Sequence, residues 1–277
     1  MGSDRYYPEE RPAHPVTVGT FEMGAATVTN RGFGAFVAQT GYLTTAEIAL
    51  DPGSATGMPP DYFLAGSLVF QMTSGPVNLH DFRNWWQLVP GACWHAPEGP
   101  GSSIIDRQDH PVVHVSLFDA LAYADWAGLA LPSEPEWEYA ARDGAETIYP
   151  WGKDLTRDGK ACANTWNGQF PWQNDRTDHA PFSMPARAFQ ASRYGLYNMI
   201  GNVWEWTGDK FASSHALSGP CCSPGGPRDG EMYVAKGGSF LCAPSYCRRY
   251  RASARSPQEA RSSTSHLGFR CVRRADV

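Results

Sequence analysis

The chain has 277 residues and a formal net charge of −5, a balance that argues against general nucleic-acid binding. Charged residues make up 18% and aromatic residues 13%, and the 28 glycines and 22 prolines indicate many loops and little long regular structure. No apolar run of about 18 residues and no signal-type N-terminus occur, so we expect a cytoplasmic protein without a membrane segment. Seven cysteines, an odd number, also fit a reducing compartment better than a closed disulfide framework.

The N-terminal part of the chain shows signals for one strand and one helix. Residues 14–23 alternate weakly between apolar and polar side chains, which is typical of a strand. Thr29 is a suitable N-cap for a helix that continues to about Gln39 and ends at Gly41. Residues 51–66 are rich in glycine and proline, which predicts a surface loop.

The middle of the chain predicts a buried strand followed by two helices. Residues 110–115 are typical of a short buried strand, and a serine begins each of the amphipathic segments 116–128 and 133–144. The second segment also has a glutamate three residues after its serine, which is the pattern of a capping box. Beyond residue 145 no long helical periodicity occurs, and no linker separates two cores. We therefore expect a single domain over residues 1–277.

Two thiols close together, Cys242 and Cys247, make residues 237–256 the most informative stretch. Nearby positive charge lowers the pKa of a thiol, and paired thiolates without adjacent histidines suit Cu(I) better than a hard ion. A short-loop disulfide or two buried apolar thiols would satisfy the same spacing. The arginines that follow the pair form either an electrostatic aid to the thiolates or a salt-bridged face; they are Arg248, Arg249, Arg251 and Arg255.

Oxygen-bearing side chains gather in two loops that are candidates for calcium. Calcium prefers carboxylate, amide and backbone carbonyl oxygens in turns, although the same residues often serve only turn formation. The candidates are Asn198, Asn202 and Glu205 in residues 195–206, and Asn164, Asn167, Asn174, Asp175 and Asp178 in the preceding loop.

The remaining cysteines and histidines do not form an evident site. Cys221 and Cys222 are adjacent and are interpreted as loop thiols, because zinc pairs usually lie two to four residues apart. His110 and His114 lie on a segment expected to be extended, which separates them, so we expect them to form hydrogen bonds in the core. Phosphate-binding, dinucleotide-binding and nucleophile-elbow motifs are absent from the sequence.

Seven segments of the chain resemble segments of the formylglycine-generating enzymes, also called sulfatase-modifying factors, and they occur in the same order. The paired cysteines in the context GGS-x-x-C-x-x-S-Y-C are the most specific part, because they separate the oxidases from non-catalytic relatives. The resemblance implies an α+β fold with low regular secondary structure, related to C-type lectins. The matching segments are residues 85–102, 109–116, 131–142, 149–152, 195–209, 236–251 and 266–271.

The resemblance implies an aerobic copper oxidase that converts the cysteine of a C-x-P-x-R motif to Cα-formylglycine. Its partner would be an unfolded sulfatase or a C-x-P-x-R peptide, with O₂ as co-substrate. A related oxidase acting on another peptide or thiol, and a lectin-like binding module, are the alternatives. The positions implied are Cys242 and Cys247 for Cu(I), Ser239 and Tyr246 as their active-site neighbours, and Trp204, Phe189 and Arg249 for the substrate peptide.

The resemblance also implies two Ca²⁺ sites. The first set is Asn164 and Asp178 with the carbonyls of Thr165 and Ala180, and the second is Asn198 and Glu205 with the carbonyls of Gly201 and Val203.

Departures from the family pattern concern the substrate region, the disulfides and the first strand. Ala243, Pro244 and His266 stand at positions where other members differ, and we expect them to affect substrate preference. Alanines replace the usual disulfide partners, so Cys93, Cys162 and Cys271 are expected to be free thiols. The chain begins where the family's first strand normally ends, so that strand is expected to be truncated.

Overall fold

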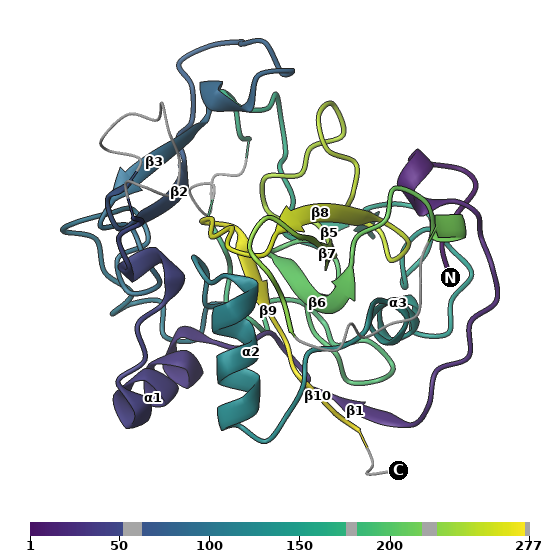
Figure 1. Ribbon diagram of the computed structural model, residues 1–277. Helices are drawn as coiled ribbons and strands as arrows, with labels where there is room; N and C mark the ends of the chain where they lie inside the picture. Colours follow the sequence, from purple (N-terminus) through teal and green to yellow (C-terminus); the bar gives the residue numbers. More distant parts are fainter. Residues whose placement is uncertain (52–62, 176–181, 218–225, 275–277) are drawn as a thin grey trace.

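The computed structural model describes residues 1–51, 63–175, 182–217 and 226–274, and its helices and strands are short (Figure 1). Long loops connect them, which confirms the expected α+β fold with little regular structure. None of the described helices is long and apolar enough to cross a membrane. The helices are α1 Asn30–Thr40, α2 Leu117–Trp126 and α3 Glu134–Arg142, with 3-10 turns η1 Pro8–Glu10, η2 Thr45–Glu47, η5 Phe82–Asn84 and η6 His215–Leu217.

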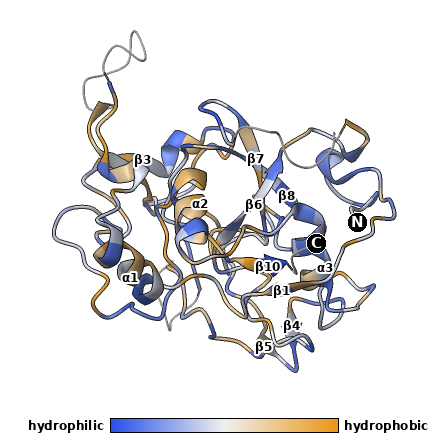
Figure 2. Cartoon of the chain, turned by 60° about the horizontal axis from the view of Figure 1, so that its bottom comes forward, coloured by the Kyte–Doolittle hydropathy of each residue, from blue (hydrophilic) through white to orange (hydrophobic). Residues whose placement is uncertain are grey.

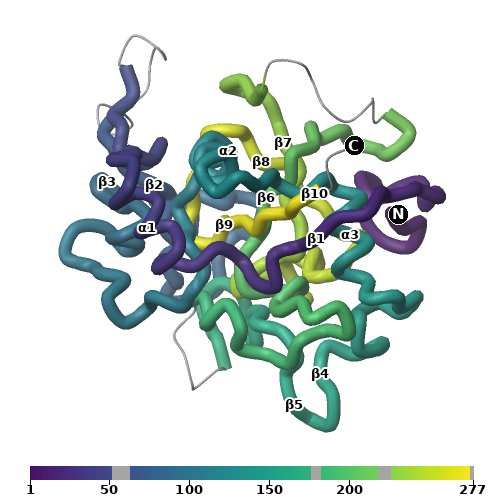
Figure 3. The backbone as a smooth tube through the Cα atoms, turned by 90° about the horizontal axis from the view of Figure 1, so that it is seen from below, coloured from purple at the N-terminus to yellow at the C-terminus, as the bar shows by residue number. Residues whose placement is uncertain are grey.

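The largest described sheet has four strands in the order β8-β7-β6-β9. Neighbouring strands run antiparallel except for the parallel pair β6 and β9. Strands β1 and β10 pair with each other, which brings two segments from opposite ends of the chain side by side (Figure 3). The strands are β1 Phe21–Met23, β2 Gly66–Phe70, β3 Trp86–Pro90, β4 Thr156–Arg157, β5 Lys160–Ala161, β6 Trp204–Lys210, β7 Met232–Lys236, β8 Arg255–Glu259, β9 Leu267–Phe269 and β10 Val272–Arg274.

Local capping chemistry sets the start of the three helices in the described residues, as the sequence predicts. Thr29 Oγ1 accepts a hydrogen bond from an amide in the first turn of α1, and Gly41 ends this helix in the left-handed conformation. Ser116 and Ser133 cap α2 and α3, each within a capping box. These side chains satisfy amides that have no partner inside the helix.

Two strand predictions are wrong in part. Of residues 14–23, only the last three form a strand, because residues 14–20 are largely exposed and no described strand pairs with them. Residues 110–115 are mostly buried, but they make only an isolated bridge between Pro111 and Thr29. The backbone of His114 has φ 59°, which interrupts the extended run.

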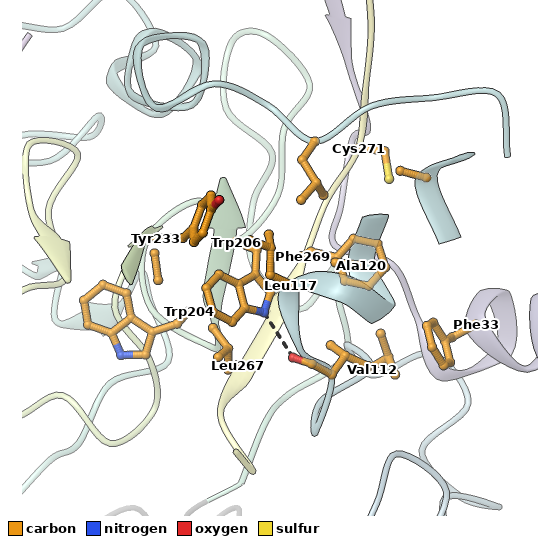
Figure 4. Close-up of a cluster of buried hydrophobic side chains, with 14 of the residues drawn as sticks. Phe33, Val112, Leu117, Ala120, Trp204, Trp206, Tyr233, Leu267, Phe269 and Cys271 are labelled. Atoms are coloured by element: carbon orange, nitrogen blue, oxygen red, sulfur yellow. Dashed lines mark hydrogen bonds between the residues drawn. The ribbon is translucent and has the colours of Figure 1, made fainter. Parts of the chain in front are cut away.

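The main core lies between α1, α2 and the four-stranded sheet (Figure 4). Apolar residues run along α2 (Figure 2), and Leu117 packs with Trp206 of β6 and Phe269 of β9. The Trp206 indole donates a hydrogen bond to Val115 O at 3.0 Å, so its polar atom is satisfied in the core. Cys242 belongs to the same buried cluster, which fixes the base of the cysteine loop on a rigid support.

The prediction for His114 is confirmed. The ring is buried, with Nδ1 2.8 Å from Ser67 Oγ and Nε2 2.8 Å from Pro97 O. Burial lowers the pKa of His114 to about 4, so this imidazole is neutral at pH 7 and serves the core. His110 lies apart from it and contacts Ser183 Oγ at 3.1 Å.

Candidate active site

The two cysteines lie on the loop that connects β7 to β8, residues 237–254. The loop begins with Gly237 and Gly238, both with positive φ. A Cβ atom on Gly238 would lie 2.9 Å from Tyr250 Cα, so a side chain here would push the two ends of the loop apart. These glycines therefore allow the loop to fold back on itself directly after β7.

Cys242 and Cys247 face each other inside this loop, as predicted from their spacing. Their Sγ atoms are 3.0 Å apart, and both cysteines are free. A disulfide would require about 2.05 Å, so the pair is a dithiol in contact. Cys242 is 1% exposed, whereas Cys247 is only partly buried. A molecule approaching from solvent thus meets Cys247 first.

The two sulfurs differ in their electrostatic surroundings. The hydrogen bond from Cys242 lowers the pKa of Cys247 to about 7, and the backbone and charge of Arg249 act in the same direction. Burial, followed by the interaction with Cys247, raises the pKa of Cys242 well above its usual value. At neutral pH the pair therefore tends toward a Cys247 thiolate that accepts a hydrogen bond from the Cys242 thiol.

Ser239 forms a hydrogen bond with the buried Cys242, and His266 in turn forms one with Ser239. Ser239 N donates to Cys242 Sγ at 3.4 Å, and Ser239 Oγ lies 3.0 Å from His266 Nδ1. Burial lowers the pKa of His266 to about 3, so the ring is neutral and its Nδ1 can accept a hydrogen bond from the Ser239 hydroxyl. Leu241 N donates to the same Oγ at 3.2 Å, which fixes the serine. His266 is thus part of the site, which its departure from the family pattern only partly indicated.

An aromatic wall stands beside the cysteine pair. Tyr246 is 37% exposed and stacks on Phe170, with ring centroids 4.6 Å apart and an interplanar angle of 4°. Trp85 meets the edge of Tyr246 at 5.1 Å and is itself fully buried. Sequence reasoning missed Phe170 and Trp85, since nothing local connects them with the cysteine loop.

The N-terminal segment holds Arg249. Its guanidinium donates to Glu9 Oε1 at 2.6 Å and lies 3.9 Å from the centre of the Tyr7 ring. Arg248 N also donates to Tyr7 Oη at 3.2 Å. Arg249, Arg251 and Arg255 form ion pairs with glutamates, and Arg249 also acts electrostatically on Cys247. A substrate group that contacts Arg249 would have to compete with Glu9 for its guanidinium.

The two residues expected to line a peptide groove have different surroundings. Trp204 is 3% exposed and packs in the main core, so the direct peptide contact expected of it does not agree with this structure. Its position at the start of β6 places it among the packed residues of the central sheet. Phe189 is partly buried in the loop after residue 182, so part of its surface is open to solvent, and its contact with a peptide stays a prediction.

The second expected calcium set is described completely. Asn198 Oδ1 is buried and has no hydrogen-bond partner in the described chain, as a metal ligand awaiting its ion would be. Glu205 already accepts hydrogen bonds from Arg270 at 2.6 Å and from Trp137 Nε1 at 2.7 Å. Asn198 Oδ1 is therefore the side-chain oxygen of this set that is available to a cation, whereas both carboxylate oxygens of Glu205 are already paired with Arg270.

The first calcium set is described in part. Asn164 and Thr165 are buried, and Asn202 N donates to Asn164 O at 2.8 Å, which links the two loops. Four residues of the sequence-based predictions lie outside the described residues: Asp178, Ala180, Cys221 and Cys222.

Comparisons with known proteins identify the family of the chain. The sulfatase-modifying factor enzyme 1-like domain matches residues 1–275. The formylglycine-generating enzyme of Mycobacterium tuberculosis is 49% identical over 281 residues, covering 98% of this chain and 93% of that protein. That of Thermomonospora curvata is 45% identical over 277 residues, covering 96% and 86%. The chain belongs to the formylglycine-generating enzyme family.

Structural comparison extends the family fold to more distant proteins. PvdO from Pseudomonas aeruginosa aligns with a TM-score of 0.65 over 99% of this chain and 90% of that chain. The identity is 22%, so the likeness concerns the fold alone. The shared fold does not indicate a reaction. In this member of the formylglycine-generating enzyme family, the pair Cys242 and Cys247 is the feature that indicates one.

Cys93, Cys162 and Cys271 are free in the structure, as predicted. We expect all three to react with an alkylating reagent after unfolding without reductant. In the native protein Cys162, which is partly exposed, should react first, because burial raises the pKa of Cys271 to about 12 and Cys93 is buried. Peptide mapping by mass spectrometry checks this, and a disulfide-linked peptide containing any of the three would contradict it.

Proposed function

We propose that this chain is a copper-dependent aerobic oxidase that converts the cysteine of a C-x-P-x-R motif in a sulfatase to Cα-formylglycine. The observation that carries the proposal is the reduced, mostly buried pair Cys242 and Cys247, with sulfurs 3.0 Å apart. Relatives at 49% and 45% identity named formylglycine-generating enzymes support the same reaction.

The donor set of the pair fits Cu(I). Both donors are sulfur, and in the described part of the chain no further His, Cys, Asp or Glu donor joins them in a three-ligand cluster. Soft thiolates favour Cu(I), and a site with only two protein ligands leaves room for the substrate thiolate. Bound copper, together with O₂, would supply the oxidation of the substrate carbon.

The chain's own residues would hold and orient the reactants. Ser239 N fixes the buried sulfur of Cys242, and the charge of Arg249 favours the thiolate form of Cys247. The exposed edge of Tyr246, stacked on Phe170, offers a rigid apolar surface beside Cys247 for an incoming peptide. This wall would also limit the access of water to the sulfurs.

The substrate is expected to be an extended segment, and neither nucleic acid nor a membrane is expected as a partner. Because Cys242 is 1% exposed, a substrate cysteine must enter the loop to reach the sulfur pair. A cysteine in a finished fold could do so only after local unfolding. We therefore expect a C-x-P-x-R peptide to be converted faster than a folded sulfatase that carries the unmodified cysteine.

The experiment incubates the peptide with Cu(I)-loaded protein in air and detects the thiol-to-aldehyde mass change. The same peptide with serine in place of cysteine is the control and should stay unchanged, because oxygen is a poor ligand for Cu(I). Absence of conversion would contradict the proposed function and leave a binding role. Equal or faster conversion of the folded sulfatase would contradict only the extended substrate.

Calcium is proposed to order the loop that contains Asn198. A chelator is expected to lower the melting temperature, because an ion bound only to the native state stabilises it by about 2.7 kcal/mol at a hundredfold excess over Kd. Asn198→Ala should remove most of this response, since the buried Oδ1 has no described partner. Asn84→Ala, at an exposed asparagine, is the matched control. A chelator without effect on the native protein would contradict the site.

A further inference from the structure

Three potential metal ligands of different chemistry meet away from the cysteine loop. One donor atom each from Glu47, Cys93 and His95 lies within 4.8 Å of the other two. Glu47 belongs to η2, whereas Cys93 and His95 follow β3 in the segment CWH. His95 Nε2 is 3.3 Å from Glu47 Oε1, so two segments far apart in sequence already touch through their ligand atoms.

The carboxylate of Glu47 is oriented by a buried neighbour. Glu47 Oε2 accepts hydrogen bonds from Thr44 N at 2.9 Å and from Thr44 Oγ1 at 2.6 Å. Thr44 is fully buried, which fixes this arrangement. The other oxygen, Oε1, is the one directed at His95. Metal-binding carboxylates are commonly held in this way by a hydrogen bond to their second oxygen.

The sulfur of Cys93 is also held in place by its surroundings. Cys93 is 4% exposed and packs against Ala46 and Ala96. Paired backbone hydrogen bonds of 3.2 and 3.1 Å between Cys93 and Ala96 close a tight turn. Burial raises the pKa of the Cys93 thiol, and the backbone amides of His95 and Ala96 oppose this rise. The turn therefore holds the sulfur at a fixed position near the donor atoms of Glu47 and His95.

We propose that Glu47, Cys93 and His95 form a second metal site for a divalent transition ion of the Zn²⁺ class. Sulfur, imidazole nitrogen and carboxylate oxygen are all zinc ligands, and three protein ligands leave a fourth position for water or an external ligand. The thiolate and the carboxylate together balance the charge of the ion. Calcium and magnesium are disfavoured, because they require an oxygen-only set.

The surroundings of His95 provide access for the ion. Its side chain is 51% exposed, while that of Glu47 is 19% exposed, so solvent reaches the site from the His95 side. The bound ion would connect η2 to the turn at 93–96, in addition to the contact between His95 and Glu47 and the small cluster around Ala46 that already join these segments. Binding requires Cys93 to release its thiol proton to solvent.

The test uses the full chain carrying Cys242→Ser and Cys247→Ser, so that the copper pair cannot contribute, and titrates it with Co²⁺. We expect a thiolate-to-cobalt absorption band that saturates at one equivalent and disappears when Zn²⁺ is added. Adding Cys93→Ser should abolish the band, and adding His95→Ala should weaken Co²⁺ affinity by tenfold or more. Cys271→Ala, which removes another buried thiol, should leave the band unchanged.

His95 is half exposed, so its replacement tests metal binding without disturbing the folded core. His95→Ala should fold like the parent, as judged by circular dichroism, yet lose the rise in melting temperature that Zn²⁺ gives the parent. No thiolate band in the parent, or a band that survives Cys93→Ser, would overturn the site. Unchanged affinity in both His95→Ala and Glu47→Gln would also overturn it, because the ion would then bind to the cysteine alone.

Discussion

Replacing Cys247 by serine is expected to remove tight Cu(I) binding and peptide conversion together. The serine hydroxyl is a hard donor, and it would leave Cys242 as the single soft ligand of the loop. The decrease in Cu(I) affinity should exceed the ~10–100-fold decrease that is typical when a residue hydrogen-bonded to a metal ligand is replaced, because here a ligand itself is removed. Competition with a chromophoric Cu(I) chelator measures the affinity, and mass spectrometry of the peptide product measures turnover.

Cys162→Ser is the matched control for this experiment. It makes the same chemical change at a partly exposed free thiol outside the cysteine loop, so both affinity and turnover should stay at the parental values. Cys242→Ser should resemble Cys247→Ser, because each sulfur is half of one donor pair. A Cys247→Ser protein that still binds Cu(I) tightly and converts the peptide would contradict the assignment of this pair.

The parts of the fold that depend on local chemistry were predictable from the sequence. Helix starts at Thr29, Ser116 and Ser133 follow from side chains that satisfy amides within the next turn. Strands require a partner elsewhere in the chain, and sequence alternation does not report one. Residues 14–20 show the alternation and lack a described partner strand, whereas residues 110–115 are mostly buried without a ladder.

The residues of the site also fall into a part that was predictable from local sequence and a part that was not. Cys242 and Cys247 lie five residues apart, so one loop can bring them together, and their context indicated copper. Phe170 and Glu9 reach the loop from distant segments, and no pattern near the cysteines points to them. Trp204 was expected in the groove, but β6 lies inside the four-stranded sheet and its side chain packs into the core.

The N-terminal segment is fixed to the cysteine loop by a buried ion pair, and breaking it should have a large effect on stability. Glu10 is fully buried and accepts hydrogen bonds from Arg251 at 2.6 and 2.8 Å and from Ser253 Oγ at 2.8 Å. The guanidinium also lies 3.6 Å from the centre of the Tyr6 ring. Glu10→Ala would leave the charge of Arg251 buried without a counter-ion, so we expect a loss of about 3–5 kcal/mol in the free energy of unfolding.

Urea denaturation of Glu10→Ala, compared with Glu22→Ala, measures this effect. The pair of Glu22 with Arg273 is exposed, so its loss should change stability by less than about 1 kcal/mol. The double variant Glu10→Leu/Arg251→Met should be considerably more stable than Glu10→Ala, because it contains no buried charge without a counter-ion. A Glu10→Ala protein as stable as Glu22→Ala would mean that the ion pair does not anchor the segment. Because Glu9 in the same turn holds Arg249 beside Cys247, loosening this anchor should also weaken Cu(I) binding.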